Sequence, residues 1–403
     1  MAAAVLCQLG YAAYTGRQVA PAHFGAYATA LALFHTSAVL TTVMVQLVLK
    51  KAELTERFLG SALLLAAGAG TLVCLVLQLL APLAGLVWDA PELVAFLRVL
   101  LLYNLIAPVA AVCTAALRGA SRFRTAALLE FTGQLAGFLC GAALLAAGLN
   151  PLGIATVSVA SAVVPAAGGL LLLRPRVAFD ARLLAEVRAM AGEFRLCARS
   201  AVTHSVMYGL PMWVAAAVLG AAATGHYSRA FYFASMVPTM LAQALTRIAV
   251  PAFARRTARG DAAFGEGLLV ALTAASALVA VATGVLAALG PTALVLLLGA
   301  GWESAGALVP WCLAGLGLQV LCTLGHQADE ARGDHAAVWA NQKLIAAVIA
   351  AGCGAAALLA SPHALVLAHA AGVLTGHAAQ LRRWARAGLL LPRPRARADA
   401  AHG

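Results

Sequence analysis

Charged residues are scarce in this chain. Asp, Glu, Lys and Arg make up 10% of its 403 residues, whereas hydrophobic residues make up 63%. A soluble globular domain carries about 25% charged residues, so the composition excludes that class. We predict a membrane protein in which little chain remains for a soluble catalytic domain.

The motifs of common catalytic and cofactor sites are absent from the sequence. It has no GxxxxGK[ST] phosphate loop, no HExxH zinc motif and no GxSxG nucleophile turn. None of the eight cysteines forms a CxxC pair, so we interpret them as small apolar packing residues rather than as a disulfide or zinc framework. We therefore predict no enzyme, no cofactor and no metal site, and expect transport to depend on a gradient or a partner instead of on ATP hydrolysis by this chain.

Long apolar stretches fill most of the sequence. About 20 apolar residues in a helix cross the roughly 30 Å of hydrocarbon in a bilayer. Stretches that meet or approach this length are residues 2–20, 24–49, 58–80, 93–117, 126–148, 151–173, 201–222, 226–252, 267–290, 304–326, 337–360 and 362–381. The predicted fold class is an all-α polytopic membrane bundle of about 12 transmembrane helices in two six-helix lobes.

The longest polar interruption divides these stretches six and six. We predict an N-terminal six-helix lobe at 1–173, a cytoplasmic amphipathic linker at 174–200, a C-terminal six-helix lobe at 201–384 and a basic cytoplasmic tail at 385–403. Within the linker, apolar residues at helical spacing favour a helix that lies on the inner leaflet. These residues are Leu183, Leu184, Val187 and Met190.

Basic residues occur mainly in every second gap between the apolar stretches, when the gaps are numbered from the N-terminus. Among the 27 Lys and Arg residues, only Arg17, Arg98 and Arg229 lie at or near the odd-numbered gaps; the others lie in or near the even-numbered gaps and in the C-terminal tail. Because basic residues resist translocation, this pattern predicts the cytoplasmic (inner) membrane with both termini cytoplasmic. The net charge of +12 is spread over many loops, which favours contact with anionic membrane lipids and no nucleic acid.

Acidic residues are rare inside the predicted spans, where Glu130 stands alone, while arginines lie near the outer helix ends. A guanidinium group binds phosphate through two parallel hydrogen bonds, so this balance favours an anionic substrate such as a diphosphate. An alternative remains open for Arg98 and Arg229, whose side chains could instead extend to the membrane interface. The candidate substrate-binding residues are Arg17, Arg98, Tyr103, Asn104, Arg229, Tyr232, Gln243 and Arg247.

Three segments resemble a known family. They are PAHFGAYATA at 21–30, GHYSRAFYFASMVPTMLAQALTRIAVPAFAR at 225–255 and LLLGAGWESAGALVPW at 297–312. In sequence, order and spacing they are similar to the oligosaccharide flippases, the polysaccharide-transporter branch of the multidrug/oligosaccharidyl-lipid/polysaccharide exporter (MOP) superfamily.

The resemblance implies a flippase that moves an undecaprenyl-diphosphate-linked oligosaccharide to the outer leaflet for surface polysaccharide assembly, such as lipopolysaccharide or exopolysaccharide. It also implies two lobes that alternate between inward and outward openings around a cavity that contains cationic residues. By position, Arg17, Arg229 and Arg247 correspond to these cationic residues. The first helix is shorter than the family pattern. A polysaccharide polymerase and glycosyltransferases are possible partners. Two alternatives stay open: a small-molecule or drug antiporter of the same superfamily, and a non-transporting membrane component of polysaccharide synthesis.

Overall fold

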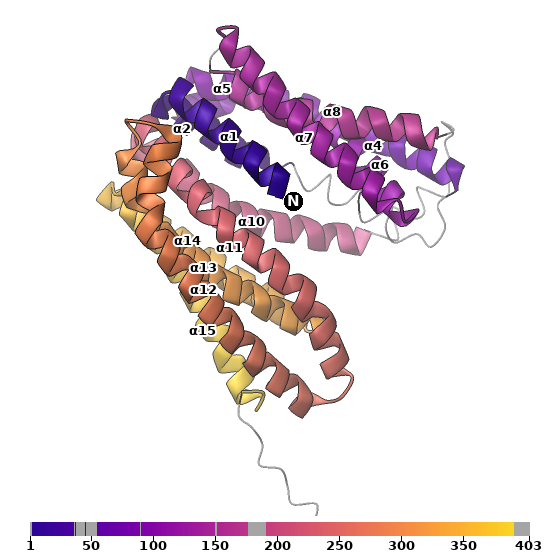
Figure 1. The fold of residues 1–403 in the computed structure, drawn as a ribbon, viewed down its shortest axis with the longest axis vertical. Helices are drawn as coiled ribbons and strands as arrows, with labels where there is room; N and C mark the ends of the chain where they lie inside the picture. The colour runs from indigo at the N-terminus through magenta and orange to yellow at the C-terminus, as the bar shows by residue number, and fades with distance from the viewer. Residues whose placement is uncertain are drawn as a thin grey trace, which may run out of the picture. The chain divides into compact units, whose positions relative to one another are not determined.

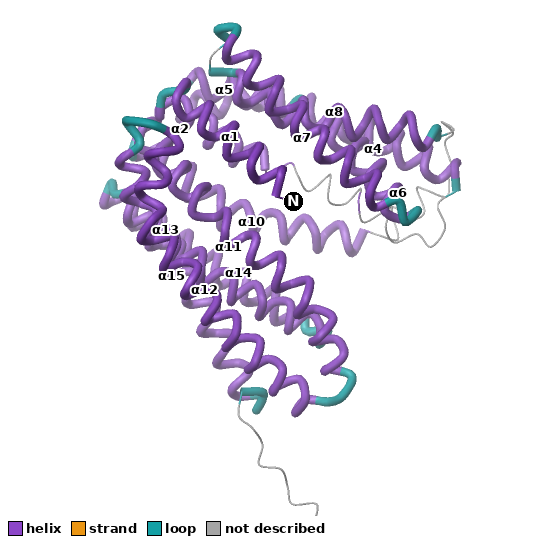
Figure 2. The backbone as a smooth tube through the Cα atoms, in the orientation of Figure 1, coloured by secondary structure: helices purple, strands orange, loops and turns teal. Residues whose placement is uncertain are grey.

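The computed structural model describes residues 2–35, 37, 45, 55–88, 90–149, 151–175 and 191–390. These residues are almost entirely helical, and none of them forms a strand (Figure 2). The described helices are α1 (Ala2–Gln18), α2 (Pro21–His35), α4 (Glu56–Trp88), α5 (Pro91–Leu101), α6 (Tyr103–Gly119), α7 (Phe123–Ala146), α8 (Gly153–Leu173), α10 (Ala191–Val218), α11 (Gly220–Thr257), α12 (Asp261–Leu298), α13 (Glu303–Ala331), α14 (His335–Leu359) and α15 (Pro362–Arg386).

The helices match the twelve predicted stretches when α5 and α6 are taken together as the single span Pro91–Gly119. By length and composition, 9 of the described helices could cross a membrane. A helix satisfies its backbone N–H and C=O groups internally, which is required where no water is available. The predicted all-α multi-span membrane bundle is confirmed.

The helix that follows the predicted linker begins earlier than the sequence pattern suggested. The linker was expected to extend to residue 200, but α10 begins at Ala191. The last ten residues of the predicted linker, 191–200, therefore belong to α10. The predicted amphipathic helix around Leu183–Met190 and the C-terminal residues 391–403 lie outside the described residues.

The chain forms two compact units. The first comprises Met1–Ser228 with Leu296–Trp302, and the second comprises Arg229–Val295 with Glu303–Gly403. The seven-residue segment at 296–302 is therefore part of the first unit, although the chain on both sides of it belongs to the second. The division into lobes at 174–200 stays a prediction, because most of the linker is not described.

Each unit has its own apolar core. In the first, α4 and α6 meet through a cluster that includes Phe58, Leu59 and Val112. In the second, Phe253 and Trp384 pack with other apolar residues of α11, α12, α13 and α15 near the ends of these helices. These cores bury the large side chains on which the helix positions depend.

Helices α7 and α8 lie side by side in the first unit (Figure 1). Glycines at four-residue spacing on α7 allow this close approach. A Cβ atom at Gly133 would lie 2.5 Å from the Ser161 carbonyl oxygen, and one at Gly137 would lie 2.6 Å from the Val157 carbonyl oxygen. No side chain fits at these positions unless the helices move apart.

We therefore expect Gly137→Ala to destabilise the protein by about 1–3 kcal/mol, as other overpacked sites do. The matched control is Gly354→Ala on α14, where an added Cβ meets nothing within 4 Å. That change should stabilise the helix by up to about 1 kcal/mol, because alanine has the higher helix propensity. Thermal unfolding of the detergent-solubilised variants measures both effects, and equal stabilities would contradict the packing role of Gly137.

Candidate functional site

Four of the predicted substrate-binding residues share one face of α11. Successive residues of an α-helix are rotated by about 100°, so Arg229, Tyr232, Gln243 and Arg247 fall within about 60° of one another around the axis. The rise from Arg229 to Arg247 is about 27 Å, which is close to the roughly 30 Å thickness of bilayer hydrocarbon. We call these four residues the α11 polar stripe.

The stripe is accessible along most of its length. Tyr232, Gln243 and Arg247 are exposed and Arg229 is half-buried. The Arg229 guanidinium carbon lies 5.9 Å from the centre of the Tyr232 ring, an arrangement in which the ring face attracts the cation. Met236 and Met240 occupy the same face between the two ends, so the stripe consists of two polar pairs joined by flexible apolar side chains.

Arg17 lies at the end of α1 and contacts the last turn of α12. Its Nη2 donates a hydrogen bond to the Leu296 carbonyl oxygen at 3.1 Å. The neighbouring Gly16 carbonyl oxygen accepts a hydrogen bond from Trp302 Nε1 at 2.9 Å. One of the five N–H groups of the Arg17 guanidinium is thus used within the protein.

Arg98, Tyr103 and Asn104 lie in the α5–α6 span. The Arg98 side chain is exposed, and its carbonyl oxygen accepts a hydrogen bond from Gln78 Nε2 at 2.7 Å. The Tyr103 ring packs edge-on against Phe34, with ring centres 5.4 Å apart. Tyr103 therefore contributes to the contact between α2 and α6.

Asn104 of α6 is buried against α4 and Ser37 in the first unit. It is 3% exposed, and its Oδ1 accepts a hydrogen bond from Ser37 Oγ at 3.1 Å. A Cβ atom at Gly70 of α4 would lie 2.2 Å from the Asn104 carbonyl oxygen. The structure thus separates the eight candidates: Arg17, Arg98, Tyr103 and Asn104 belong to the first unit, and the α11 polar stripe belongs to the second.

The acidic residue predicted inside a span has a basic partner. Arg118 Nη2, near the end of α6, lies 2.5 Å from Glu130 Oε1 on α7. The pair fastens these two neighbouring helices. Glu130 is therefore not an unpaired carboxylate that could attract an organic cation.

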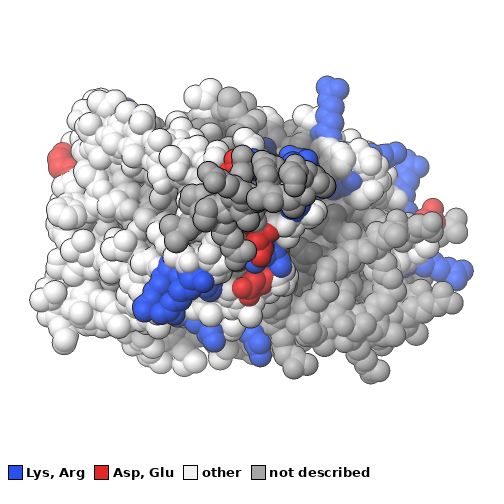
Figure 3. All heavy atoms as spheres, turned by 90° about the horizontal axis from the view of Figure 1, so that it is seen from below, with Lys and Arg blue, Asp and Glu red and all other residues white. Residues whose placement is uncertain are grey.

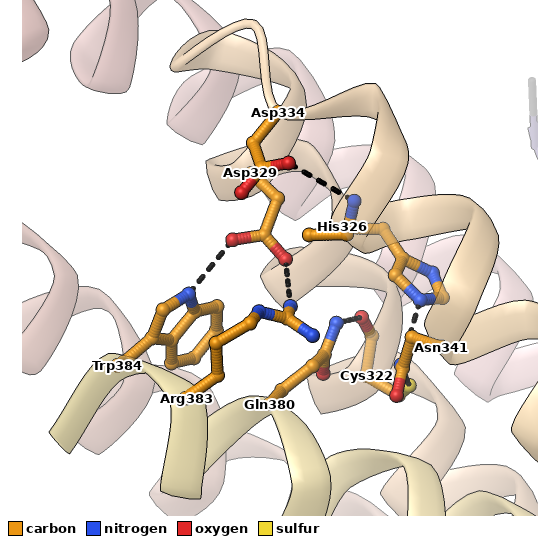
Figure 4. A network of polar contacts seen from close by, with 9 residues as sticks. Cys322, His326, Asp329, Asp334, Asn341, Gln380, Arg383 and Trp384 are labelled. Atoms are coloured by element: carbon orange, nitrogen blue, oxygen red, sulfur yellow. Dashed lines mark hydrogen bonds and ion pairs between the residues drawn. The ribbon is translucent and has the colours of Figure 1, made fainter. Parts of the chain in front are cut away.

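A second acid, Asp329 of α13, lies inside the bundle and was not predicted from the sequence. The tenth apolar stretch ends at residue 326, but α13 continues to Ala331 and leaves Asp329 only 2% exposed. The carboxylate accepts hydrogen bonds from Trp384 Nε1 at 2.7 Å and from Arg383 Nη2 at 2.5 Å, both on α15 (Figure 4). The sequence signal was the lack of a helix breaker before Gly333.

Further polar contacts extend this cluster to α14. Asn341 Nδ2 lies 2.9 Å from His326 Nε2, and Gln380 Nε2 donates to the Cys322 carbonyl oxygen at 3.3 Å (Figure 4). An asparagine amide nitrogen can only donate, so the His326 nitrogen accepts. The α13–α15 polar network therefore joins three helices of the second unit. Within the described part of the chain, no group of three or more His, Cys, Asp and Glu side chains could hold a metal ion.

Comparisons with known proteins agree with this architecture. Residues 16–307 match the family described as "Polysaccharide biosynthesis protein". No curated protein matches the chain.

Several solved structures share the fold. A multidrug resistance MATE family transporter of the MOP superfamily, in an inward-facing conformation, is 14% identical with a TM-score of 0.67, and the match covers 95% of each chain. The lipid II flippase MurJ, in an inward closed conformation, is 12% identical with a TM-score of 0.69 over 95% of this chain and 86% of that one. A MOP superfamily transporter from Pyrococcus furiosus is 14% identical with a TM-score of 0.59 over 94% and 92%. At these identities the likeness shows the MOP superfamily fold.

The Asp329–Arg383 pair gives a test of the α13–α15 polar network. Removing one partner of a buried pair leaves an uncompensated charge. The Asp329 side chain is 4% exposed and the Arg383 side chain is 33% exposed. We expect Arg383→Met to destabilise the protein by about 2–3 kcal/mol, less than for a fully buried pair because Arg383 is partly hydrated. Asp329→Asn should restore much of this loss in the double variant.

The control is the Asp261–Arg332 pair, which joins α12 to α13 at 2.8 Å and whose aspartate side chain is 67% exposed, so that loss of the arginine leaves a hydrated carboxylate. Arg332→Met should cost less than about 1 kcal/mol. Thermal unfolding in detergent compares the variants, and a double variant no more stable than Arg383→Met alone would contradict the account.

Proposed function

Since this chain belongs to the polysaccharide biosynthesis protein family, we propose that it is a flippase for an undecaprenyl-diphosphate-linked oligosaccharide. It translocates this lipid across the cytoplasmic membrane for surface polysaccharide assembly and alternates between inward and outward openings. The observation that carries the proposal is the α11 polar stripe, which has an arginine at each end. The MOP fold, which is also that of the lipid II flippase MurJ, supports it.

The stripe suits the chemistry of such a cargo. A hydrated sugar and diphosphate head group cannot enter hydrocarbon without losing its hydrogen bonds to water. Arg229 and Arg247 are spaced by about 27 Å along one helix face, and each guanidinium can bind a phosphate through paired hydrogen bonds. The head group would follow the protein surface while the prenyl chain stays in the lipid.

The membrane potential would favour outward movement of this cargo. Each charge gains about 2.3 kcal/mol per 100 mV, so a diphosphate with about two charges gains roughly 4–5 kcal/mol. The proposal places the basic loops and both termini in the cytoplasm. Lys and Arg side chains are visible at several separate places in Figure 3, with acidic side chains between some of them; basic side chains favour contact with anionic lipid head groups.

A small-molecule or drug antiporter is the second candidate, because a multidrug resistance transporter shares the fold. An exporter of organic cations needs a carboxylate that is free to bind them. Glu130 is paired with Arg118, and Asp329 with Arg383 and Trp384. These contacts favour an anionic cargo. The enzymes that build and consume the lipid-linked oligosaccharide, glycosyltransferases and a polymerase, would then be the functional partners.

We expect Arg229→Ala and Arg247→Ala each to lower surface polysaccharide about tenfold or more, because a charge-assisted contact contributes about 1.5–3 kcal/mol. Arg98→Ala should also lower it if this exposed arginine attracts the cargo. Lysine at 229 should restore only part of the output, since it keeps the charge but not the planar fork. Immunoblots of the membrane fraction check that the protein is present, and Arg255→Ala, on the same helix but off the stripe, is the matched control.

Removal of the gene should cause the lipid-linked oligosaccharide to accumulate on the cytoplasmic side of the membrane. If the lipid-linked oligosaccharide accumulates but both stripe variants still produce full amounts of surface polysaccharide, the protein is a flippase whose mechanism does not use the stripe. If the lipid-linked oligosaccharide does not accumulate, the proposal that the protein transports it is wrong. A non-transporting role in polysaccharide synthesis would then explain the result better.

A further inference from the structure

The polar groups of the α11 polar stripe are confined to its two ends. Arg229 and Tyr232 lie at the end nearer the seventh gap, and Gln243 and Arg247 lie at the end nearer the eighth. The segment 233–242 between them contains no charged or amide side chain. Its methionines on the stripe face offer no hydrogen-bond donor and only a weak sulfur acceptor. The stripe is therefore interrupted in its middle over roughly 16 Å of helix rise.

The two arginines are too far apart to bind one diphosphate together. Their Cα atoms are separated by about 27 Å along the helix axis. An arginine side chain extends about 7 Å from its Cα, as its number of bonds dictates. Even if both side chains extend toward each other, more than about 10 Å remains between the two guanidinium groups. The two phosphates of a diphosphate share one bridging oxygen, so a head group bound to Arg247 has to leave it before Arg229 can bind it.

Each end combines a guanidinium with a neutral polar group. Gln243 and Arg247 are exposed and lie four residues apart, so their side chains are neighbours on adjacent turns. Their N–H groups suit phosphate oxygens and their amide oxygen suits a sugar hydroxyl. At the other end the Arg229 guanidinium carbon lies 5.9 Å from the centre of the Tyr232 ring. The ring face attracts the cation, and the phenol oxygen can both donate to and accept from a sugar hydroxyl.

A proline lies between the two ends. Pro238 is buried inside α11, and it has no N–H to donate to the carbonyl oxygen of Ala234 one turn earlier. Membrane helices bend at such positions. A bend at Pro238 changes the direction of one end of the stripe relative to the other and leaves the side-chain pair at each end intact.

We propose that the α11 polar stripe holds two separate binding sites for an anionic head group, which the cargo occupies one after the other. Gln243 and Arg247 form the inner site, which receives the head group when the protein opens inward. Arg229 and Tyr232 form the outer site, which holds it when the protein opens outward. This inference rests on the proposed function for the cargo and its direction, and it adds the number, the place and the order of the sites.

Protection of single cysteines from a maleimide distinguishes two sites from one. Ala244→Cys reports on the inner site and Met236→Cys on the outer site, because Ala244 is exposed beside Arg247 and Met236 is half-buried one turn beyond Tyr232. Each variant is purified in detergent and labelled with and without farnesyl diphosphate, and labelling of the parent is subtracted to remove the native cysteines. Farnesol, which lacks the diphosphate, is the ligand control.

Farnesyl diphosphate should protect both cysteines. We expect Arg247→Ala to abolish protection at residue 244 alone and Arg229→Ala to abolish it at residue 236 alone, because each arginine serves its own site. Protection that persists at the other cysteine shows that the variant is folded. Arg255→Ala, on the same helix but off the stripe, should keep both protections.

Two results would overturn the proposal, and they bear differently on the cargo. If either arginine substitution abolishes protection at both cysteines, the stripe forms one shared site and the diphosphate cargo still stands. If farnesyl diphosphate protects neither cysteine in the parent background, the stripe binds no diphosphate lipid, and the stripe's role in the proposed function fails together with the two sites.

Discussion

The structure depends on one constraint: the hydrocarbon of a membrane offers no hydrogen-bond partners. Every backbone N–H and C=O must then be paired within the chain, and the described residues meet this condition as helices. Polar contacts between helices follow the same rule. The indole of Trp302 donates to the Gly16 carbonyl oxygen, and the carboxylate of Asp329 accepts from two side chains of α15.

The same constraint separates the arginines by role. Arg118 and Arg383 pair with acids, and Arg17 donates to a carbonyl oxygen. These side chains hold helices together. On the α11 polar stripe, by contrast, cationic and polar side chains follow an accessible face for about the thickness of the hydrocarbon. Exposed charge at that depth is costly unless it serves a polar path, which is why the stripe carries the functional proposal.

Much of the fold could be predicted from the sequence, because a membrane span is defined by the local length of an apolar run. The shared face of Arg229, Tyr232, Gln243 and Arg247 is also contained in their spacing. The sequence could not show that burial turns Asn104 into a packing residue, since this depends on Gly70 and Ser37, distant in the chain. Nor could it show that Asp329 lies inside the bundle, because its partners come from another helix.

Contacts between helix ends bear on the alternation of the loops. Within the first unit His23 lies 2.7 Å from Glu92, which joins the first and third gaps. Trp302 contacts both Gly16 and His226, which joins the first, seventh and ninth gaps. Within the second unit Asp261 pairs with Arg332, which joins the eighth and tenth. Each of these contacts therefore joins two odd-numbered gaps or two even-numbered gaps. This is required if every helix crosses the membrane once, because gaps of the same parity then lie on the same side.

The most direct test of the central claim is the sidedness of these gaps in intact cells. Single cysteines can be placed at Ser121 and Gly333 in even gaps, and at Leu149 and Gly301 in odd gaps, then labelled with a membrane-impermeant maleimide before and after permeabilisation. The account predicts labelling at 149 and 301 from outside, and at 121 and 333 only after permeabilisation. Labelling of 121 or 333 in intact cells would contradict it.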